Sequence, residues 1–292
     1  MVNLASRIEL PERAVALETT LLLHGVPTSS ALPLHRELGQ IARQHGAIPA
    51  LCGVVAGTPV VGITDDELHV LLDAKPHIAK VNSANIGMAM YRQQHAATTV
   101  GTTMELAADA GVSFFATGGI GGVHKGYGVD LDISADLTAL TRFPVAVVTS
   151  GVKSILDVGA TREALETLGI PVVGVGTDTF PAFYLRDGGC TVDARFDDMH
   201  ELAAFCRYEL KRTGRGIVVA NPIPIPDELD RNSFDRWVTA AEAEADASGA
   251  VGRDRTPAIL GALHRISRGA TLRANIALVR DNTRVASLLA AA

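Results

Sequence analysis

Two lysines stand where a predicted strand ends. Lys153 follows the apolar run "FPVAVV" within "TSGVKSILD", at a predicted change from a buried strand to a helix, and Lys80 ends the strand predicted in "HIAKVNS". Only five of the 26 basic residues are lysine. A lysine amine that is desolvated and close to another cation loses affinity for its proton and becomes a nucleophile toward a carbonyl carbon. We interpret one lysine as that nucleophile and the other as a ligand for an anion such as phosphate; two surface lysines are the alternative.

A carboxyl group is predicted in an apolar setting. Glu18 lies inside "AVALETTLLLHG", where its neighbours are strongly apolar. Desolvation there raises the pKa of a carboxyl, which can then donate a proton near neutral pH. The alternative is a glutamate on an edge strand that faces water.

A glycine-rich stretch, "TGGIGGVHKGYGVDLDISADL" at residues 117–137, contains six glycines. Such density permits positive φ angles and lets backbone N–H groups face an anion. The stretch matches neither the dinucleotide fingerprint nor the P-loop spacing. A mobile surface loop is the alternative, but the segment also carries several polar side chains, namely His124, Lys125, Asp130, Asp132, Ser134 and Asp136.

Asp132 is the candidate metal ligand. Leu131 and Ile133 flank it, so an alternating strand would turn the carboxylate to the face opposite these two side chains. A hard divalent cation such as Mg²⁺ or Mn²⁺ often takes one or two protein carboxylates and keeps several waters. The other interpretation, a cap for the helix in "SADLTAL", suits Ser134 better.

Three further polar residues have weaker support. Asn221 in "ANPIPIP" and Asn275 in "RANIALV" are candidate hydrogen-bond donors to a substrate, or caps of a turn or helix. His24 follows an apolar run, and a structural histidine is a better interpretation than a catalytic base.

Short apolar runs alternate with amphipathic segments along the whole chain. Strands are predicted at 14–23, 48–63 with a hairpin turn at 56–58, 77–81, 97–101, 112–119, 144–151, 171–177 and 216–222. Helices are predicted at 32–47, 65–73, 84–94, 103–111 and 152–169, then a polar helix and loop at 227–254 and two closing helices at 256–292. This alternation is typical of a layered α/β fold with a largely parallel sheet, and no composition shift marks a domain boundary.

The unusual polar segments all follow predicted strands. Ligands of such sheets bind at the carboxyl ends of the strands. The segments there are "GGIGGVHKG" after "SFFAT", the Lys153 segment after "AVVTS", "TDTFPAFY" after "VVGVG" and "NPIPIP" after "GIVVA". A purely structural role would scatter these residues between both ends of the strands.

Composition narrows the class of partner. A net charge of -6 and a pI near 5.8 argue against a nucleic-acid or anionic-membrane surface. Because there is no basic N-terminal region followed by an apolar run and no long uninterrupted apolar stretch, we expect a cytoplasmic protein. The three cysteines, Cys52, Cys190 and Cys206, have no paired spacing, so we expect free thiols and no zinc site.

Taken in order, these residues resemble the pseudouridine-5'-phosphate glycosidase family, which includes the indigoidine-cluster A proteins. The matching stretches span nearly the whole chain and are "ALETTLLLHGVP", "ATTVGTTMELAADAG", "FFATGGIGGVHKG", "DISADL", "PVAVVTSGVKSILD", "PVVGVGTDTFPAFY", "ANPIP" and "LRANIALVRDN". The resemblance implies a single three-layer α/β/α domain over residues 1–292 with a largely parallel or mixed sheet. It also implies a homotrimer and a divalent metal, commonly Mn²⁺, with Mg²⁺ or Ca²⁺ as alternatives.

The resemblance also assigns roles by position. Glu18 matches the proton donor, Lys153 the Schiff-base nucleophile and Asp132 the metal ligand. The substrate-binding positions are Lys80, Val100, Ser134, Ala135, Asp136 and Asn275. His124, in the same glycine-rich segment, is a further candidate for substrate binding.

The implied chemistry explains why a lysine is needed. A carbon–carbon glycosidic bond has no leaving oxygen to protonate, so the usual pair of glycosidase carboxylates is insufficient. If Glu18 assists opening of the ribose ring and Lys153 forms an imine at C1, that carbon can release a carbon nucleophile or, in reverse, accept one.

One departure bears on specificity. Family members commonly have K-x-S-x-R-D-L after the lysine, whereas this chain has "KVNSANIGMAM", with Ala84 and Asn85 near the expected charged pair. We therefore expect a C-glycosynthase that joins ribose 5-phosphate to a planar aromatic acceptor in natural-product biosynthesis, like the alnumycin C-glycosynthase branch. The alternatives are a housekeeping pseudouridine-5'-phosphate glycosidase, whose acceptor is the pyrimidine uracil, and a non-catalytic sugar-phosphate binding protein.

Overall fold

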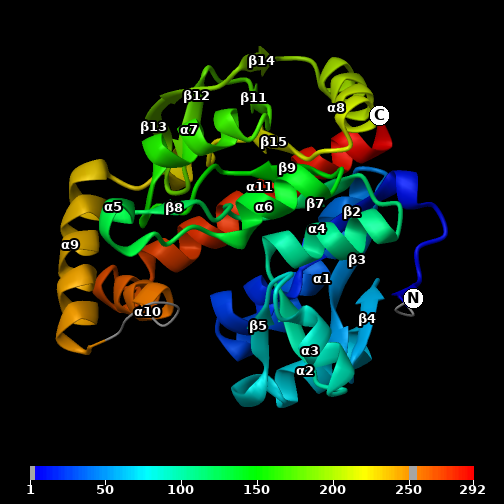
Figure 1. The fold of residues 1–292 in the computed structure, drawn as a ribbon, viewed down its shortest axis with the longest axis horizontal. Helices are drawn as coiled ribbons and strands as arrows, with labels where there is room; N and C mark the ends of the chain where they lie inside the picture. The colour runs from blue at the N-terminus through cyan, green and yellow to red at the C-terminus, as the bar shows by residue number, and fades with distance from the viewer. Residues whose placement is uncertain (1–3, 250–254) are drawn as a thin grey trace.

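A large twisted sheet forms the centre of the protein in a computed structural model that describes residues 4–249 and 255–292 (Figure 1). The described residues form an 11-stranded sheet in the order β1-β4-β3-β2-β7-β9-β15-β11-β14, with β6 paired to β3 and β5 to β6. All neighbours from β3 to β14 along this path are parallel, and the antiparallel pairs are β3 with β4 and β3 with β6. The expected largely parallel or mixed sheet is therefore confirmed.

The strands of the large sheet are β1 (Ala5–Ser6), β2 (Ala14–Glu18), β3 (Ile48–Val55), β4 (Thr58–Val61), β5 (Ala79–Val81), β6 (Ala96–Thr98), β7 (Phe114–Ala116), β9 (Ala146–Thr149), β11 (Val172–Val175), β14 (Ala194–Phe196) and β15 (Ile217–Ala220). Two small antiparallel sheets contain β8 (Val123–His124) with β10 (Leu156–Asp157), and β12 (Thr179–Ala182) with β13 (Leu185–Thr191).

The α-helices are α1 (Thr28–Gln44), α2 (Asp65–Asp73), α3 (Ile86–Tyr91), α4 (Val100–Asp109), α5 (Tyr127–Asp130), α6 (Ala135–Arg142), α7 (Val158–Thr167), α8 (Met199–Thr213), α9 (Arg231–Ala247), α10 (Arg255–Ile266) and α11 (Ala270–Ala291). Short helical turns are η1 (Pro11–Arg13), η2 (Leu21–Gly25), η3 (Lys75–His77) and η4 (Ile225–Asp227).

Helices cover both faces of the sheet. Helix α11 packs on β2, β7 and β9 and also contacts α1 and α8, whereas α4 packs on β2, β3 and β7 and contacts α6. The central strands are therefore enclosed between two helical layers, and the buried apolar side chains of the described residues form one cluster. This burial explains the continuous apolar strands, because a parallel sheet covered on both faces has no polar side.

Strand β2 is shorter than the sequence predicted. It ends at Glu18 instead of continuing to residue 23, and the chain then enters η2. Its pairing with β7 ends at Leu17 and its pairing with β3 ends at Glu18. A strand without partners beyond that point leaves backbone groups unpaired, and a helical turn pairs them locally. Glu18 thus stands at the carboxyl end of an inner strand, and the edge-strand alternative is wrong.

The predicted helix at 152–169 is also shorter. It begins at Val158, where the Asp157 side chain accepts a hydrogen bond from the backbone N–H of Ala160. The residues before it are held by the glycine-rich stretch, since Val152 bridges Ile120 and β10 pairs with β8. Lys153 therefore lies in a loop between β9 and β10, and the prediction of a direct change from strand to helix is wrong.

Other predictions fared differently. The hairpin at 56–58 is confirmed, because β3 and β4 pair across Ala56 and Gly57, both with positive φ. Val100 starts helix α4 and does not end a strand, because β6 stops at Thr98. The cysteines are free thiols. Residues 250–254 of the predicted polar loop lie outside the described residues. Within the described part of the chain, no helix has the length and apolar character needed to span a bilayer.

Candidate active site

Four of the predicted site residues line one cavity of about 360 Å³ at the carboxyl end of the sheet. Glu18 comes from the end of β2, Lys80 from β5, Lys153 from the loop after β9 and Asn275 from α11. Residues more than 200 positions apart in the chain therefore line the same cavity. The sequence prediction that strand ends would converge on one site agrees with this arrangement.

The backbone before Lys153 is held by a close approach. Gly151 has φ +82°, and a Cβ atom there would lie 1.8 Å from the carbonyl oxygen of Pro181. The Lys153 N–H then donates to the carbonyl oxygen of Ile120 at 3.1 Å. Only glycine fits at residue 151, so the turn that aims Lys153 into the cavity depends on it.

Glu18 is a carboxyl group surrounded by protein at the cavity wall. The Thr117 hydroxyl donates a hydrogen bond to Glu18 Oε1 at 2.6 Å. Burial raises the pKa of Glu18 above its ordinary value, while the positive charge of Lys153 and the hydrogen bond from Thr117 act in the opposite direction. Because burial is the largest influence, Glu18 holds its proton to a higher pH than an ordinary glutamate, which suits a proton donor.

The charge of Lys153 acts on the neighbouring amine of Lys80. Desolvation lowers the pKa of Lys80, the positive charge of Lys153 lowers it further, and Glu18 partly compensates. Although its amine is desolvated, Lys80 as a whole is exposed, as is the preceding residue of the short strand β5. Two amines and one carboxyl at a single cavity form a site that can bind an anion and perform proton transfer.

An apolar wall faces these polar groups. Leu21, Phe183, Tyr184 and Leu260 line it, and the Phe183 and Tyr184 rings pack edge to face with centroids 4.6 Å apart. The hydroxyl Oγ1 of Thr20, a residue that lines the same cavity, is buried and has no hydrogen-bond partner among the residues that the structure describes. A ligand with a polar part and a flat apolar part fits this lining. Sequence reasoning missed the wall, because ordinary apolar residues carry no signal of the cavity they line.

Two histidines also line the cavity, and neither was predicted there. Desolvation, followed by the charges of Lys80 and Lys75, lowers the pKa of His24 to about 4. Such a weak base agrees with the interpretation that His24 is not the catalytic base. His264 of α10 is fixed by a 2.8 Å hydrogen bond between its Nδ1 and the Thr271 hydroxyl, and burial lowers its pKa.

Four other predicted substrate-binding residues form a separate cluster that does not line this cavity, namely Val100, Ser134, Ala135 and Asp136. Val100 is buried at the start of α4, and Ser134 caps α6 by accepting a hydrogen bond from the Asp136 N–H. The Asp136 carboxylate accepts from the N–H groups of Gly101 and Gly121 at 2.9 and 2.8 Å. The glycine-rich stretch was predicted to face an anion with its backbone N–H groups. At Gly121 this anion is the carboxylate of Asp136.

The remaining member of that cluster, Ala135, is the first residue of α6 and is half-buried. Two hydrogen bonds connect this cluster to the segment that carries Lys80. The hydroxyls of Thr99 and Thr102, close to Val100 in the chain, both donate to the carbonyl oxygen of Val81, the residue after Lys80. Its role in binding substrate stays a prediction.

His124 and Asp132 approach each other outside the cavity lining. Nδ1 of His124 is 3.7 Å from Oδ2 of Asp132, whose side chain is 45% exposed. Leu131 and Ile133 are both exposed, whereas Asp132 between them is half-buried. Instead of the full strand that was predicted, Leu131 has φ +50° at the end of α5 and Ile133 forms an isolated antiparallel bridge with Val123.

The surroundings of Asp132 define which metal would fit. Among the described residues, no group of three or more His, Cys, Asp or Glu side chains is arranged to hold a metal. One accessible carboxylate fits a cation that keeps most of its waters, as Mg²⁺ and Mn²⁺ do, and not a metal that needs a cage of protein ligands.

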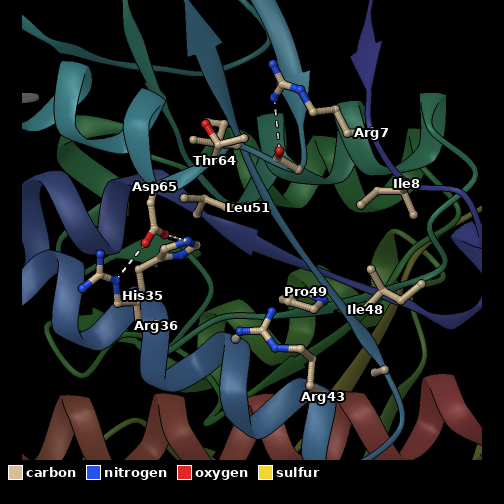
Figure 2. A pocket seen from close by; sticks show the side chains of 14 residues that line it. Arg7, Ile8, His35, Arg36, Arg43, Ile48, Pro49, Leu51, Thr64 and Asp65 are labelled. Carbon is tan, nitrogen blue, oxygen red and sulfur yellow. Dashed lines mark hydrogen bonds and ion pairs between the residues drawn. The ribbon is translucent and has the colours of Figure 1, made fainter.

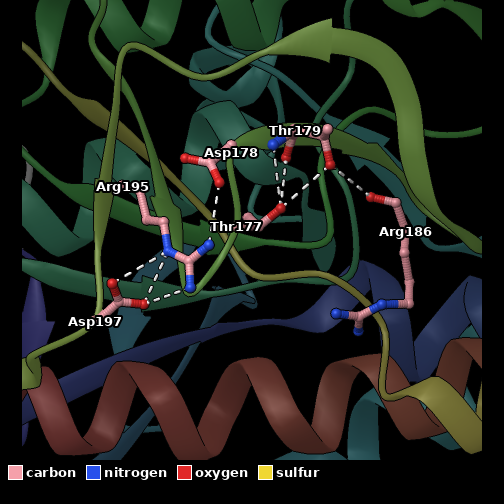
Figure 3. Close-up of polar contacts among 6 residues, drawn as sticks. All are labelled: Thr177, Asp178, Thr179, Arg186, Arg195 and Asp197. Atoms are coloured by element: carbon pink, nitrogen blue, oxygen red, sulfur yellow. Dashed lines mark hydrogen bonds and ion pairs between the residues drawn. The ribbon is translucent and has the colours of Figure 1, made fainter.

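Two of the predicted polar segments mainly contact other parts of the protein instead of lining the cavity. Asn221 donates through Nδ2 to Asp281 and Asn282 of α11 at 2.8 and 2.9 Å, so it fastens the end of β15 and does not reach the cavity. After β11, Arg195 pairs with Asp178 and Asp197 at the surface (Figure 3). That segment contributes to the cavity only through Phe183 and Tyr184.

The departure after Lys80 is explained locally. The Asn85 side chain accepts from the N–H of Asn82 at 2.8 Å, and the Asn82 side chain accepts from the N–H of Ala84 at 2.9 Å. These contacts close the turn between β5 and α3, and neither Ala84 nor Asn85 lines the cavity. The prediction that this change alters the acceptor pocket therefore has no support in the cavity lining.

A larger cavity of about 450 Å³ lies elsewhere, between α1, β3 and the start of α2 (Figure 2). It contains none of the predicted site residues. Arg36 pairs with Asp65 there, and Arg7 pairs with Glu67. Size alone would favour this cavity, but the groups able to form a covalent intermediate are in the smaller one, which we take as the active site.

The cavity combines two amines and one partly buried carboxyl at the carboxyl ends of strands of an α/β domain. The chain belongs to the family of indigoidine synthase A-like proteins, whose model matches residues 4–292.

Similar proteins include the pseudouridine-5'-phosphate glycosidases of Nocardioides sp. and Hahella chejuensis. The first is 45% identical over 94% of this chain and 90% of its own length, and the second is 43% identical over 96% and 93%. Among solved structures, an indigoidine synthase A-like protein from Thermotoga maritima superposes with a TM-score of 0.90 at 35% identity, covering 99% and 96%. The prealnumycin C-glycosynthase AlnA, in complex with ribulose 5-phosphate, has a TM-score of 0.89 at 34% identity, also covering 99% and 96%.

Proposed function

We propose that this protein is a pseudouridine-5'-phosphate glycosidase, which breaks or forms the carbon–carbon bond between uracil and C1 of ribose 5-phosphate. The observation that carries the proposal is the convergence of Glu18, Lys80 and Lys153 on one cavity with an apolar wall. The names of the relatives at 41 to 45% identity support it. They favour the housekeeping activity over the C-glycosynthase expected from the sequence.

The proposed cleavage uses Glu18 and Lys153 in turn. Glu18 gives its proton to the ring oxygen as the bond between that oxygen and C1 opens, and the Lys153 amine bonds to C1. The bond from C1 to C5 of uracil then breaks with its electron pair leaving on C5, and an imine between C1 and Nζ remains. Of the two protons that Nζ loses as the imine forms, C5 takes one and Glu18 regains the other. Water hydrolyses this imine, which releases ribose 5-phosphate and restores the amine.

The other residues bind and orient the substrate. Lys80 supplies a positive charge for an anionic substrate, and Asn275 and the unpartnered Thr20 hydroxyl offer hydrogen bonds within the same cavity. The flat uracil ring packs against Phe183 and Tyr184. Asp132 would hold a hydrated Mn²⁺ or Mg²⁺, which supplies positive charge for phosphate oxygens when bound. Assembly as a homotrimer remains a prediction.

The C-glycosynthase activity is a second candidate, favoured by the TM-score of 0.89 with AlnA. The two functions share the chemistry at C1 and differ in the carbon nucleophile. Incubation with ribose 5-phosphate, uracil and Mn²⁺ separates them. Efficient consumption of uracil supports the glycosidase, whereas an imine at Lys153 without uracil turnover supports the C-glycosynthase.

Borohydride trapping tests the shared chemistry. The protein is incubated with ribose 5-phosphate and Mn²⁺, reduced, and analysed by peptide mass spectrometry. We expect one ribose phosphate adduct, on Lys153, and none in Lys153→Ala. Lys211→Ala, which changes an exposed lysine of α8, is the control and should be labelled like the unaltered protein. If sugar phosphate binds but Lys153 carries no adduct, the protein is a non-catalytic binding protein and the proposed function is wrong.

A further inference from the structure

A third, very small cavity lies behind Glu18. Its volume is about 10 Å³, and its lining is apolar except for two side chains, Glu18 and His35. Glu18 therefore lines two spaces, the active-site cavity and this small cavity. A space of this size is the smallest that holds one water molecule, which needs at least two polar partners.

His35 also lines this small cavity, and one of its ring nitrogens is buried. It lies on α1, its side chain is 13% exposed, and its Nδ1 atom is buried with no hydrogen-bond partner among the described residues. Buried polar atoms nearly always have a partner, so this atom calls for one. The same side chain also lines the large cavity of Figure 2, so His35 lies between the surface and the space behind Glu18.

The other ring nitrogen defines the proton position. Nε2 of His35 lies 3.4 Å from Oδ1 of Asp65 (Figure 2). A carboxylate only accepts hydrogen bonds, so we assign the ring proton to Nε2, which leaves Nδ1 as an acceptor. The neutral ring is supported by its pKa, which burial lowers; Asp65 raises it, and Arg43 and Arg36 lower it further.

We propose that one water molecule in this small cavity accepts a hydrogen bond from the protonated Glu18 carboxyl and donates one to Nδ1 of His35. His35 is then a positioning residue that keeps Glu18 in its proton-donating form until substrate binds. The proposal deepens the proposed function, because it concerns the proton donor of that reaction.

The charges around Glu18 show why such a link matters. The two lysines of the active site, Lys153 and Lys80, favour the ionised carboxylate, and only Asp136 among the neighbouring charges opposes ionisation. A hydrogen-bond acceptor behind the carboxyl stabilises the acid instead. The chain from Glu18 through water and His35 to Asp65 therefore counteracts the lysines.

Two variants of His35 separate this role from simple packing. His35→Asn keeps an amide oxygen near the position of Nδ1, whereas His35→Gln keeps a group that faces Asp65 and lacks an acceptor toward the small cavity. We measure kcat/KM for pseudouridine 5'-phosphate cleavage against pH, because this ratio reports the protonation of the free enzyme. Loss of the hydrogen bond should move the basic limb of the profile about one pH unit lower in His35→Gln. The limb should stay in place in His35→Asn.

An unchanged basic limb in His35→Gln, or equal shifts in both variants, overturns the proposal. A crystal structure of the unaltered protein gives a test that does not depend on folding of the variants. Ordered water between Glu18 and His35 supports the proposal, and an empty space there overturns it. Borohydride trapping keeps the two hypotheses apart, because an adduct on Lys153 together with an unmoved limb rejects the role of His35 and leaves the proposed function intact.

Discussion

The carboxyl group of Glu18 and the amine of Lys153 line the same cavity, where the charge of Lys153 counteracts the effect of burial on Glu18. Burial raises the pKa of Glu18, and the charge of Lys153 is the largest influence in the opposite direction. Glu18 ends β2, while Lys153 follows β9, and strand β7 lies between them in the sheet. Glu18, the proposed proton donor, thus ends a parallel strand, and Lys153, the proposed nucleophile, lies in the loop after another parallel strand of the same sheet.

Replacing the proton donor tests its role directly. We expect Glu18→Gln to reduce kcat about 10²- to 10⁴-fold, because Gln fills the same space but cannot donate a proton to the ring oxygen. Steady-state cleavage of pseudouridine 5'-phosphate measures this loss. Thr117→Val is a graded comparison, since it removes only the hydrogen bond to Glu18. Full activity in Glu18→Gln would show that another group donates the proton.

The same variant predicts a pH-dependent change in stability. The pKa of Glu18 is raised in the folded state above its ordinary value of 4.5, so above that pH the folded protein holds a proton that the unfolded chain has lost. The free energy of unfolding contributed by Glu18 therefore falls as pH rises through the raised pKa. We expect Glu18→Gln to match the unaltered protein near pH 4 and to be more stable at pH 8. Urea unfolding at both values measures the difference, and an equal difference at both would contradict burial as the cause.

Lys80 is expected to bind substrate and not to react with it. Lys80→Ala should raise KM for the sugar phosphate at least about tenfold, because one charge-assisted contact to the anion is lost. The adduct on Lys153 should still form at high ribose 5-phosphate concentration. Lys75→Ala is the matched control, since Lys75 donates to Val26 and Thr28 and does not line the cavity. Loss of trapping in Lys80→Ala would show that Lys80 takes part in imine formation.

Alanine variants at two glycines with nearly the same φ angle distinguish backbone strain from steric overlap. Gly151 has φ +82° and a neighbouring carbonyl oxygen 1.8 Å from the position of a Cβ atom, whereas Gly126 has φ +83° and open space. We expect Gly126→Ala to lower the free energy of unfolding by about 1 kcal/mol. Gly151→Ala should cost about 3 kcal/mol or more and also impair trapping on Lys153. Equal losses in thermal or urea unfolding would mean that the contact with Pro181 is relieved.

Asp132 is expected to anchor the divalent metal. Asp132→Asn should weaken Mn²⁺ binding at least about tenfold and reduce metal-dependent activity, because the amide lacks the negative charge that attracts the cation. Calorimetric titration with MnCl₂ measures binding without relying on turnover. Asp109→Asn, at an exposed position of α4, serves as the control. Unchanged affinity in Asp132→Asn would place the metal elsewhere.

Much of the site was predictable because it depends on local order along the chain. A residue type that is rare in this protein, placed directly after an apolar run, led to Lys153 and Lys80, and both line the cavity. The apolar setting of Glu18 likewise predicted its raised pKa. Such inferences need only the rule that parallel strands share a carboxyl edge.

Other features depended on partners that are distant in sequence. The end of β2 at Glu18 follows from where β3 and β7 stop pairing, and the loop around Lys153 follows from its contacts with the glycine-rich stretch. The local pattern alone predicted a longer strand and a helix. Asn221 is a clear case, because its position after a strand suggested a ligand and its partners on α11 made it structural.

The sequence by itself determined the alternation of strands and helices, the α/β class and the candidate donor and nucleophile, because these depend on composition and spacing over a few residues. Only the tertiary structure decided which polar groups share a cavity, which carboxylate is occupied by backbone N–H groups, and that His35 lies behind Glu18. The physical reason is that burial, electrostatic coupling and cavity shape arise when segments far apart in the chain pack together, and no local pattern encodes those distances.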